Sequence, residues 1–83
     1  MVEIKESLRH SIEALIDAER AMDRAYQWAG GQAKSYLDVA KTANRMAQDE
    51  FIRRLPREVR KKENLINHFP YLRIRLGGDN NEE

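Results

Sequence analysis

Residues 14–47 read ALIDAERAMDRAYQWAGGQAKSYLDVAKTANRMA, and this stretch decides the fold. Alanines recur every three or four positions on both sides of Gly30-Gly31, which is the spacing of one face of an α-helix. Glycine lets the chain reverse direction at low cost. The stretch therefore predicts a tight antiparallel helical hairpin with an alanine-rich seam. The expected pairs across the seam are Ala14 with Ala47, Ala18 with Ala43, Ala21 with Ala40, and Ala25 with Tyr36.

The regions outside this stretch predict one mainly α-helical domain, residues 1–76. The hairpin helices are expected at 7–29, with Ser7 as the N-cap, and at 32–55. Pro56 disfavours helix at the residue before it, so a short third helix is expected at 57–68.

The end of the chain predicts a different kind of structure. Residues 71–76 alternate apolar and basic side chains, which is typical of a strand. The partner of this strand-like segment is left open between residues 2–5, a dimer mate and another protein. Residues 77–83 are expected to form a disordered acidic tail.

A row of larger apolar side chains runs beside the alanines. A close alanine seam would leave this row to one side of the hairpin. Burying a Leu, Ile or Met side chain stabilises by about 1.5–3 kcal/mol, so we expect a second copy to cover it. The sequence thus predicts a homodimer in the form of a four-helix bundle. The expected dimer interface comprises Leu8, Ile12, Leu15, Met22, Tyr26, Val39 and Met46.

Charge is segregated along the chain although the total is only +1. Residues 1–50 carry a net charge of −2, residues 51–76 carry +6 and residues 77–83 carry −3. Such segregation indicates either a binding surface or an acidic tail that folds back on the basic region. The expected partner-binding residues are Arg53, Arg54, Arg57, Arg60, Lys61, Lys62, Arg73 and Arg75.

The sequence holds few signals for chemistry. There is no cysteine, which excludes disulfides and thiolate metal sites and fits a cytoplasmic protein. His10 and His68 each lack the glutamate three positions earlier that helical di-iron sites use. Glu19 lies within the large apolar row, where it could be a buried functional group, lie at a rim, or pair with an arginine. We expect no metal, no cofactor, no enzymatic activity and no membrane span.

The function expected from these features is binding. The first hypothesis is a small non-enzymatic regulatory or adaptor protein that binds another protein through its basic C-terminal third. The alternative is a small nucleic-acid-binding regulator that uses the Arg53–Lys62 cluster on DNA or RNA, since basic clusters bind phosphates by releasing counterions.

Overall fold

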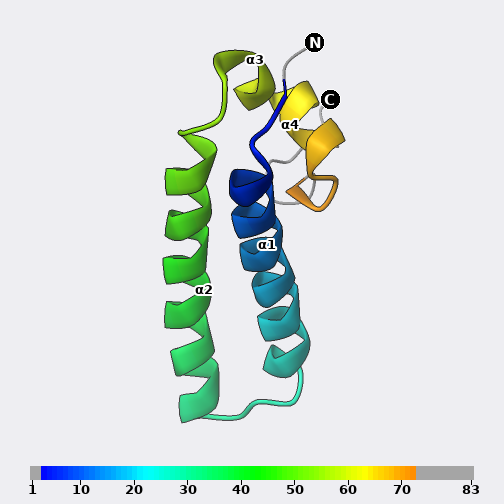
Figure 1. Ribbon diagram of the computed structural model, residues 1–83. Coiled ribbons are helices and arrows are strands. Elements are labelled where there is room, and N and C mark those ends of the chain that lie inside the picture. Colours follow the sequence, from blue (N-terminus) through cyan, green and yellow to red (C-terminus); the bar gives the residue numbers. More distant parts are fainter. Residues whose placement is uncertain (1–2, 73–83) are drawn as a thin grey trace.

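The computed structural model of the 83-residue chain describes residues 3–72. Two long helices, α1 (Glu6–Tyr26) and α2 (Gln32–Ile52), lie side by side and antiparallel (Figure 1). Two short helices, α3 (Arg57–Arg60) and α4 (Lys62–His68), lie at the end of the hairpin opposite its turn. The predicted helical hairpin is therefore confirmed, and the described residues contain no strand.

Tyr71 and Leu72, the described part of the predicted strand-like segment, do not form a strand. The amide of Leu72 donates a hydrogen bond of 2.9 Å to the carbonyl oxygen of Phe69; Tyr71 lies in a turn and Leu72 is helical, so the two residues do not begin a strand. The remainder of the predicted 71–76 segment, the tail at 77–83, and Arg73 and Arg75 lie outside the described residues.

The turn of the hairpin depends on Gly31. The end of α1 tightens through hydrogen bonds from Trp28 to Ala25 and from Ala29 to Tyr26, at 3.0 and 3.2 Å. Gly31 then takes φ 50° and ψ −119°, a backbone conformation that glycine alone adopts without strain, and α2 begins at the next residue. No atom lies within 4 Å of a Cβ placed on either glycine, so the requirement at Gly31 is conformational.

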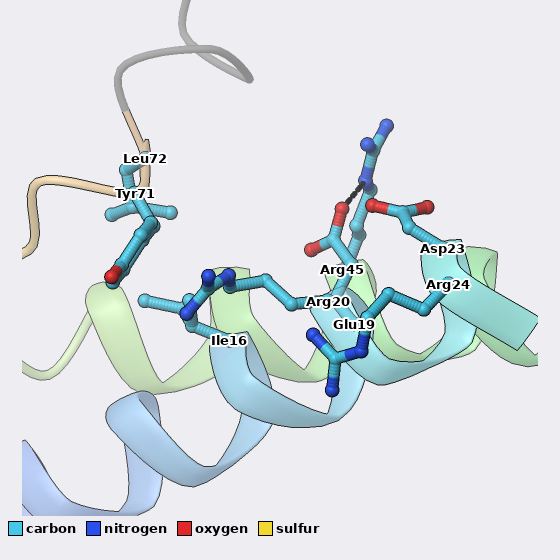
Figure 2. Close-up of a pocket in the computed structure, with 8 residues that line it drawn as sticks. All are labelled: Ile16, Glu19, Arg20, Asp23, Arg24, Arg45, Tyr71 and Leu72. Atoms are coloured by element: carbon cyan, nitrogen blue, oxygen red, sulfur yellow. Dashed lines mark hydrogen bonds and ion pairs between the residues drawn. The ribbon is translucent and has the colours of Figure 1, made fainter.

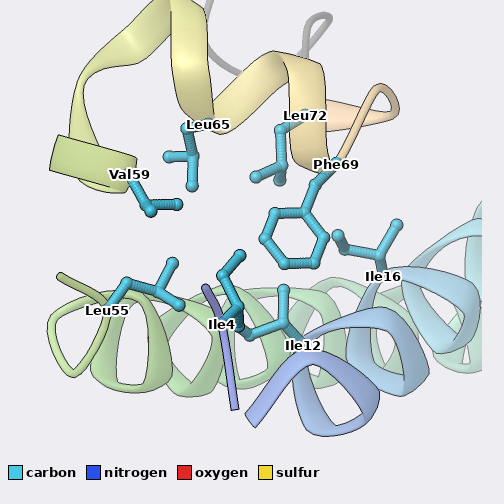
Figure 3. Close-up of a cluster of buried hydrophobic side chains, with 8 residues drawn as sticks. All are labelled: Ile4, Ile12, Ile16, Leu55, Val59, Leu65, Phe69 and Leu72. Carbon is cyan, nitrogen blue, oxygen red and sulfur yellow. The ribbon is translucent and has the colours of Figure 1, made fainter. Parts of the chain in front are cut away.

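The apolar core lies at the end of the molecule away from this turn (Figure 3). Ile12 and Ile16 of α1 meet side chains that the last third of the chain lays over them, among them Phe69. Pro56 and the short helices fold the chain back far enough to make this contact. The buried apolar set is Ile4, Ile12, Ile16, Leu55, Val59, Leu65, Phe69 and Leu72.

The expected alanine seam does not join the helices. In α1 the alanines at 14, 18, 21 and 25 are all exposed, and in α2 Tyr36, Ala40 and Ala43 are exposed too. The helices instead meet through rows of larger side chains spaced alternately four and three residues apart. The row on α1 is Leu8, Ile12, Leu15, Glu19, Met22 and Tyr26; the row on α2 and just after it is Leu37, Lys41, Asn44, Gln48, Phe51 and Leu55. We call these the contact rows.

The apolar area that is buried explains why the larger side chains, and not the alanines, lie between the two helices. Apolar stabilisation scales with the area removed from water, and an alanine offers only one methyl group. The five residues of α1 that were expected to face a second copy, from Leu8 to Tyr26, lie on its contact row. Val39 and Met46, the other two, are exposed.

The two glycines provide a matched test of the turn. We expect Gly31→Ala to lower the free energy of unfolding by about 1–3 kcal/mol, because alanine must adopt a sparsely populated conformation there. Gly30→Ala should be neutral or stabilise by up to about 1 kcal/mol, because it restricts the unfolded chain without a clash. Urea unfolding followed by circular dichroism measures both, and equal effects would contradict the assigned turn.

Candidate functional site

The basic residues predicted to bind a partner gather at the end of the hairpin away from the turn. Arg53 and Arg54 follow the last residue of α2, Arg57 and Arg60 belong to α3, and the chain continues through Lys61 and Lys62 into α4. We call these six residues the basic end. All six are exposed. Pro56 directly precedes α3 as its N-cap, and the chain changes direction there between Arg54 and Arg57.

Few of these six residues pair with other residues of the described part of the chain. Arg53 pairs with Glu50 at 2.7 Å, and the Arg54 guanidinium carbon lies 5.1 Å from the centre of the Phe51 ring. Among the described residues, none of the other four cations, Arg57, Arg60, Lys61 and Lys62, takes part in an ion pair. Exposed positive charge that the residues of 3–72 do not neutralise favours an anionic ligand.

An apolar groove of about 440 Å³ adjoins the basic end. Leu8, Phe51 and Pro56 supply its apolar lining, Lys5 and Arg54 bring positive charge to it, and Glu3 brings one negative charge. Arg54 belongs to both the groove and the basic end, so the two features form one surface. The sequence did not reveal this groove, because Leu8 and Phe51 come together only when α1 and α2 are paired.

A second hollow, of about 350 Å³, lies where Tyr71 and Leu72 approach α1 (Figure 2). Three arginines line it, but their guanidinium groups point in different directions: Arg20 reaches Tyr71, whose ring centre is 3.9 Å away, and Arg45 bonds Glu19. The side chain of Arg24 points away from both. No single anion could be held by all three, so we interpret this hollow as a junction between elements.

Polar groups hold the middle of the two contact rows together. Gln48 is fully buried, and its amide nitrogen donates to Glu19 Oε1 at 2.7 Å and to Asn44 Oδ1 at 2.6 Å. Arg45 Nε donates to the other carboxylate oxygen of Glu19 at 2.8 Å. Nearer the turn, Lys41 pairs with Asp23. The interhelical pairing of Glu19 with an arginine, one of the roles considered for it, is thus observed within a single chain.

The inward orientation of the polar members of the α2 contact row was not predicted from the sequence. Lys41, Asn44 and Gln48 were not recognised as inward-facing because each is a common surface residue. A signal was available in the sequence. Leu37, Phe51 and Leu55 keep the alternate four- and three-residue spacing of a helix that packs along another helix, although the three positions between Leu37 and Phe51 are polar.

The histidines lie apart from these features. His10 is 3.2 Å from Glu6 on an exposed part of α1, and His68 Nδ1 lies 3.4 Å from Arg9. Within residues 3–72, no three of the histidine and carboxylate side chains are grouped so as to hold a metal ion. No described helix is both long enough and apolar enough to cross a bilayer.

Comparison of the chain with protein-family models, curated proteins and solved structures finds no match. The features of the described chain that could bind a partner are therefore the basic end, the adjoining groove and the exposed apolar side chains of α2.

The polar cluster predicts unequal effects of two neighbouring substitutions. Gln48→Ala should cost about 1–3 kcal/mol of unfolding free energy, because Glu19, whose side chain is 12% exposed, loses a buried donor. Arg45→Ala should cost less, about 1 kcal/mol, since the Arg45 side chain is 45% exposed and water can take its place beside the carboxylate. Replacing Glu19 and Gln48 together by leucine should recover most of the loss, and urea unfolding measures all three variants.

Proposed function

We propose that this chain is a small non-enzymatic binding protein whose partner is an acidic segment of another protein. The observation that carries the proposal is the exposed positive charge of Arg57, Arg60, Lys61 and Lys62, which no other residue of 3–72 pairs with, beside an apolar groove. In this arrangement the cations attract the acidic residues of the partner and the groove receives one apolar side chain. Charge then governs encounter, and the groove adds affinity.

The groove favours a protein over a nucleic acid as the partner. Phosphate backbones need cations and little apolar surface, and base reading in the major groove needs a helix or ribbon that can enter it. Here α3 has four residues and α4 has seven, and both pack against the core through Val59 and Leu65. Nucleic-acid binding by the basic cluster is therefore the outcome that the test below must separate from peptide binding.

The second part of the proposal is self-association into a dimeric four-helix bundle. Its support differs from that expected from the sequence, since most of the large apolar row of α1 already packs within the chain. Tyr36, Val39 and Met46 of α2 remain 66, 68 and 65% exposed. Three large apolar side chains on one helix face of a small protein favour a protein interface.

The basic end can be tested with peptide and DNA probes. A fluorescent peptide of glutamates around one phenylalanine should bind, and its affinity should fall when alanine replaces the phenylalanine or when Arg57 and Arg60 are both changed to Ala. Removing the same charge near the turn, with Arg24→Ala and Lys34→Ala, should leave binding unchanged. Fluorescence anisotropy across a salt series measures each affinity.

A duplex DNA probe decides between the two partner classes in the same assay. Phosphate contacts lower log K with log salt by about 0.9 per contact. Tighter binding of DNA than of the peptide at physiological salt, with a slope that flattens by about two contacts in the Arg57→Ala, Arg60→Ala variant, would contradict the protein partner.

Self-association can be tested with a charge placed on the exposed face. The native chain should show twice the chain mass by light scattering as its concentration is raised from the micromolar range. Val39→Glu should shift it to the monomer mass while helix content is retained, because the buried charge would lack a partner. Asn67→Glu, which is exposed on α4, is the matched control and should remain dimeric. A native chain that stays monomeric throughout would refute the dimer.

A further inference from the structure

An acidic segment follows the last described residue, Leu72, at a short distance along the sequence. Residues 77–83, the acidic tail, contain three carboxylates and no basic residue. The basic end carries six exposed cations. The two segments therefore have opposite charge, and each is the kind of ligand that the other attracts.

The position of Leu72 determines where the residues after it can go. Leu72 is 2% exposed and lies in the apolar core, to which Leu65 of α4 and Val59 of α3 also belong. In Figure 3 these three side chains follow one another along the side of the core that α3 and α4 provide. Val59 lies between Arg57 and Arg60 in the sequence, so the chain leaves the core beside the elements that carry the basic end.

The chain after Leu72 is long enough to bring the acidic residues to the basic end. An extended chain advances about 3.3 Å per residue, so Asp79 can lie up to about 23 Å from Leu72 and Glu83 up to about 36 Å. Packed helices lie about 8–10 Å apart, so α3 is within this reach even by a path around α4. Three uncharged residues, 76–78, separate Asp79 from Arg75, the nearest basic residue before it.

Two groups of cations lie within this reach, and they differ in how much of their charge is compensated. The hollow beside Leu72 contains three arginines together with two carboxylates, Glu19 and Asp23, and Arg45 is paired with Glu19. The stretch 57–62 contains four cations and one carboxylate. Within residues 3–72, none of those four cations takes part in an ion pair. The basic end is therefore the stronger attractor for an acidic segment.

We propose that the acidic tail binds the basic end of its own chain and so regulates access to it. The inference rests on the proposed function, because the tail and the acidic partner use the same cations. The tail contains no apolar side chain, so it leaves the groove lined by Leu8 and Phe51 available. A partner that adds an apolar residue to its acidic residues has a contact that the tail lacks, and it displaces the tail. A partner with charge alone competes with the tail on nearly equal terms.

The tether, and not the strength of each contact, makes the tail an effective competitor. Exposed ion pairs are weak individually, and salt screens them. A short tether supplies an effective concentration in the millimolar range. A segment whose own dissociation constant is about 1 mM would then occupy the site for most of the time and weaken the binding of a partner about three- to tenfold.

A spin label in the tail tests where the tail lies. Asn81→Cys introduces the only cysteine of the chain and leaves the charge of the tail unchanged. A nitroxide attached there broadens the NMR signals of nearby backbone amides. We expect broadening at residues 57–62 in low salt, and its loss in the Arg57→Ala, Arg60→Ala variant and at about 1 M salt, where the Debye length is about 3 Å. Labelled chains mixed with unlabelled, isotope-enriched chains should cause no broadening, because the contact is within one chain.

Neutralising the tail tests its effect on binding. The tail variant replaces the three acids by amides: Asp79→Asn, Glu82→Gln and Glu83→Gln. The control variant does the same to three exposed acids of the hairpin: Glu13→Gln, Asp17→Asn and Asp38→Asn. By fluorescence anisotropy, the tail variant should bind the peptide of glutamates around one phenylalanine about three- to tenfold more tightly than the native chain does in low salt. The control variant should bind it as the native chain does.

The outcomes distinguish this inference from the proposed function. Broadening at Arg20 and Arg24 in place of residues 57–62, broadening spread evenly over the chain, or broadening between chains would overturn the inference. Equal peptide affinities of the native chain and the tail variant would overturn it too, while leaving the proposed function intact. Broadening at residues 57–62 in a chain that binds no peptide, with or without the tail charges, would support the tail contact and refute the peptide partner.

Discussion

The rest of the structure depends on the contact between Gln48 and Glu19. A buried amide and a nearly buried carboxylate are each unfavourable alone, because neither can recover its lost water contacts. Bonded to one another, they fix the height at which α1 and α2 meet. The apolar parts of the contact rows would tolerate a shift by one turn, but this pair would not, since a shift would break the hydrogen bond between the buried amide and the carboxylate.

The register between α1 and α2 determines which of their residues remain exposed. Once the larger row of α1 has turned toward α2, the alanines turn outward, and Tyr36, Val39 and Met46 follow on the other helix. The same register sets Leu8 beside Phe51 and so forms the groove that adjoins Arg54. The exposed apolar side chains of α2 and the groove thus both result from the register in which α1 and α2 pack.

The sequence was sufficient to predict the two hairpin helices and their turn, but it did not show which faces of the helices meet. Gly30-Gly31 and Pro56 mark boundaries through local backbone preferences, so the hairpin, its turn and the start of the third helix were predicted; Lys61 divides that third helix into α3 and α4. The seam was wrong because two rows on α1 have helical spacing, and periodicity alone does not tell which one faces α2. The deciding residues on α2 are polar, and their burial becomes favourable only when Glu19 and Asp23 stand opposite. The clustering of six basic residues in the sequence was enough to predict the basic end. The apolar groove beside it could be recognised only in the tertiary structure.

The two ends of the hairpin are stabilised by different means, and this links the proposed dimer to the proposed binding function. The apolar core covers the end that bears Ile12, Phe69 and the basic residues, so that end is held within one chain. Toward the turn, the helices meet through Tyr26, Lys41 and Asp23, which bury little apolar area and leave stability low. Tyr36 and Val39 lie in this weaker half. A second copy would thus add apolar burial where the single chain has least, while leaving the basic end accessible. The proposed self-association and the proposed partner binding would use opposite parts of the molecule, so neither need interfere with the other.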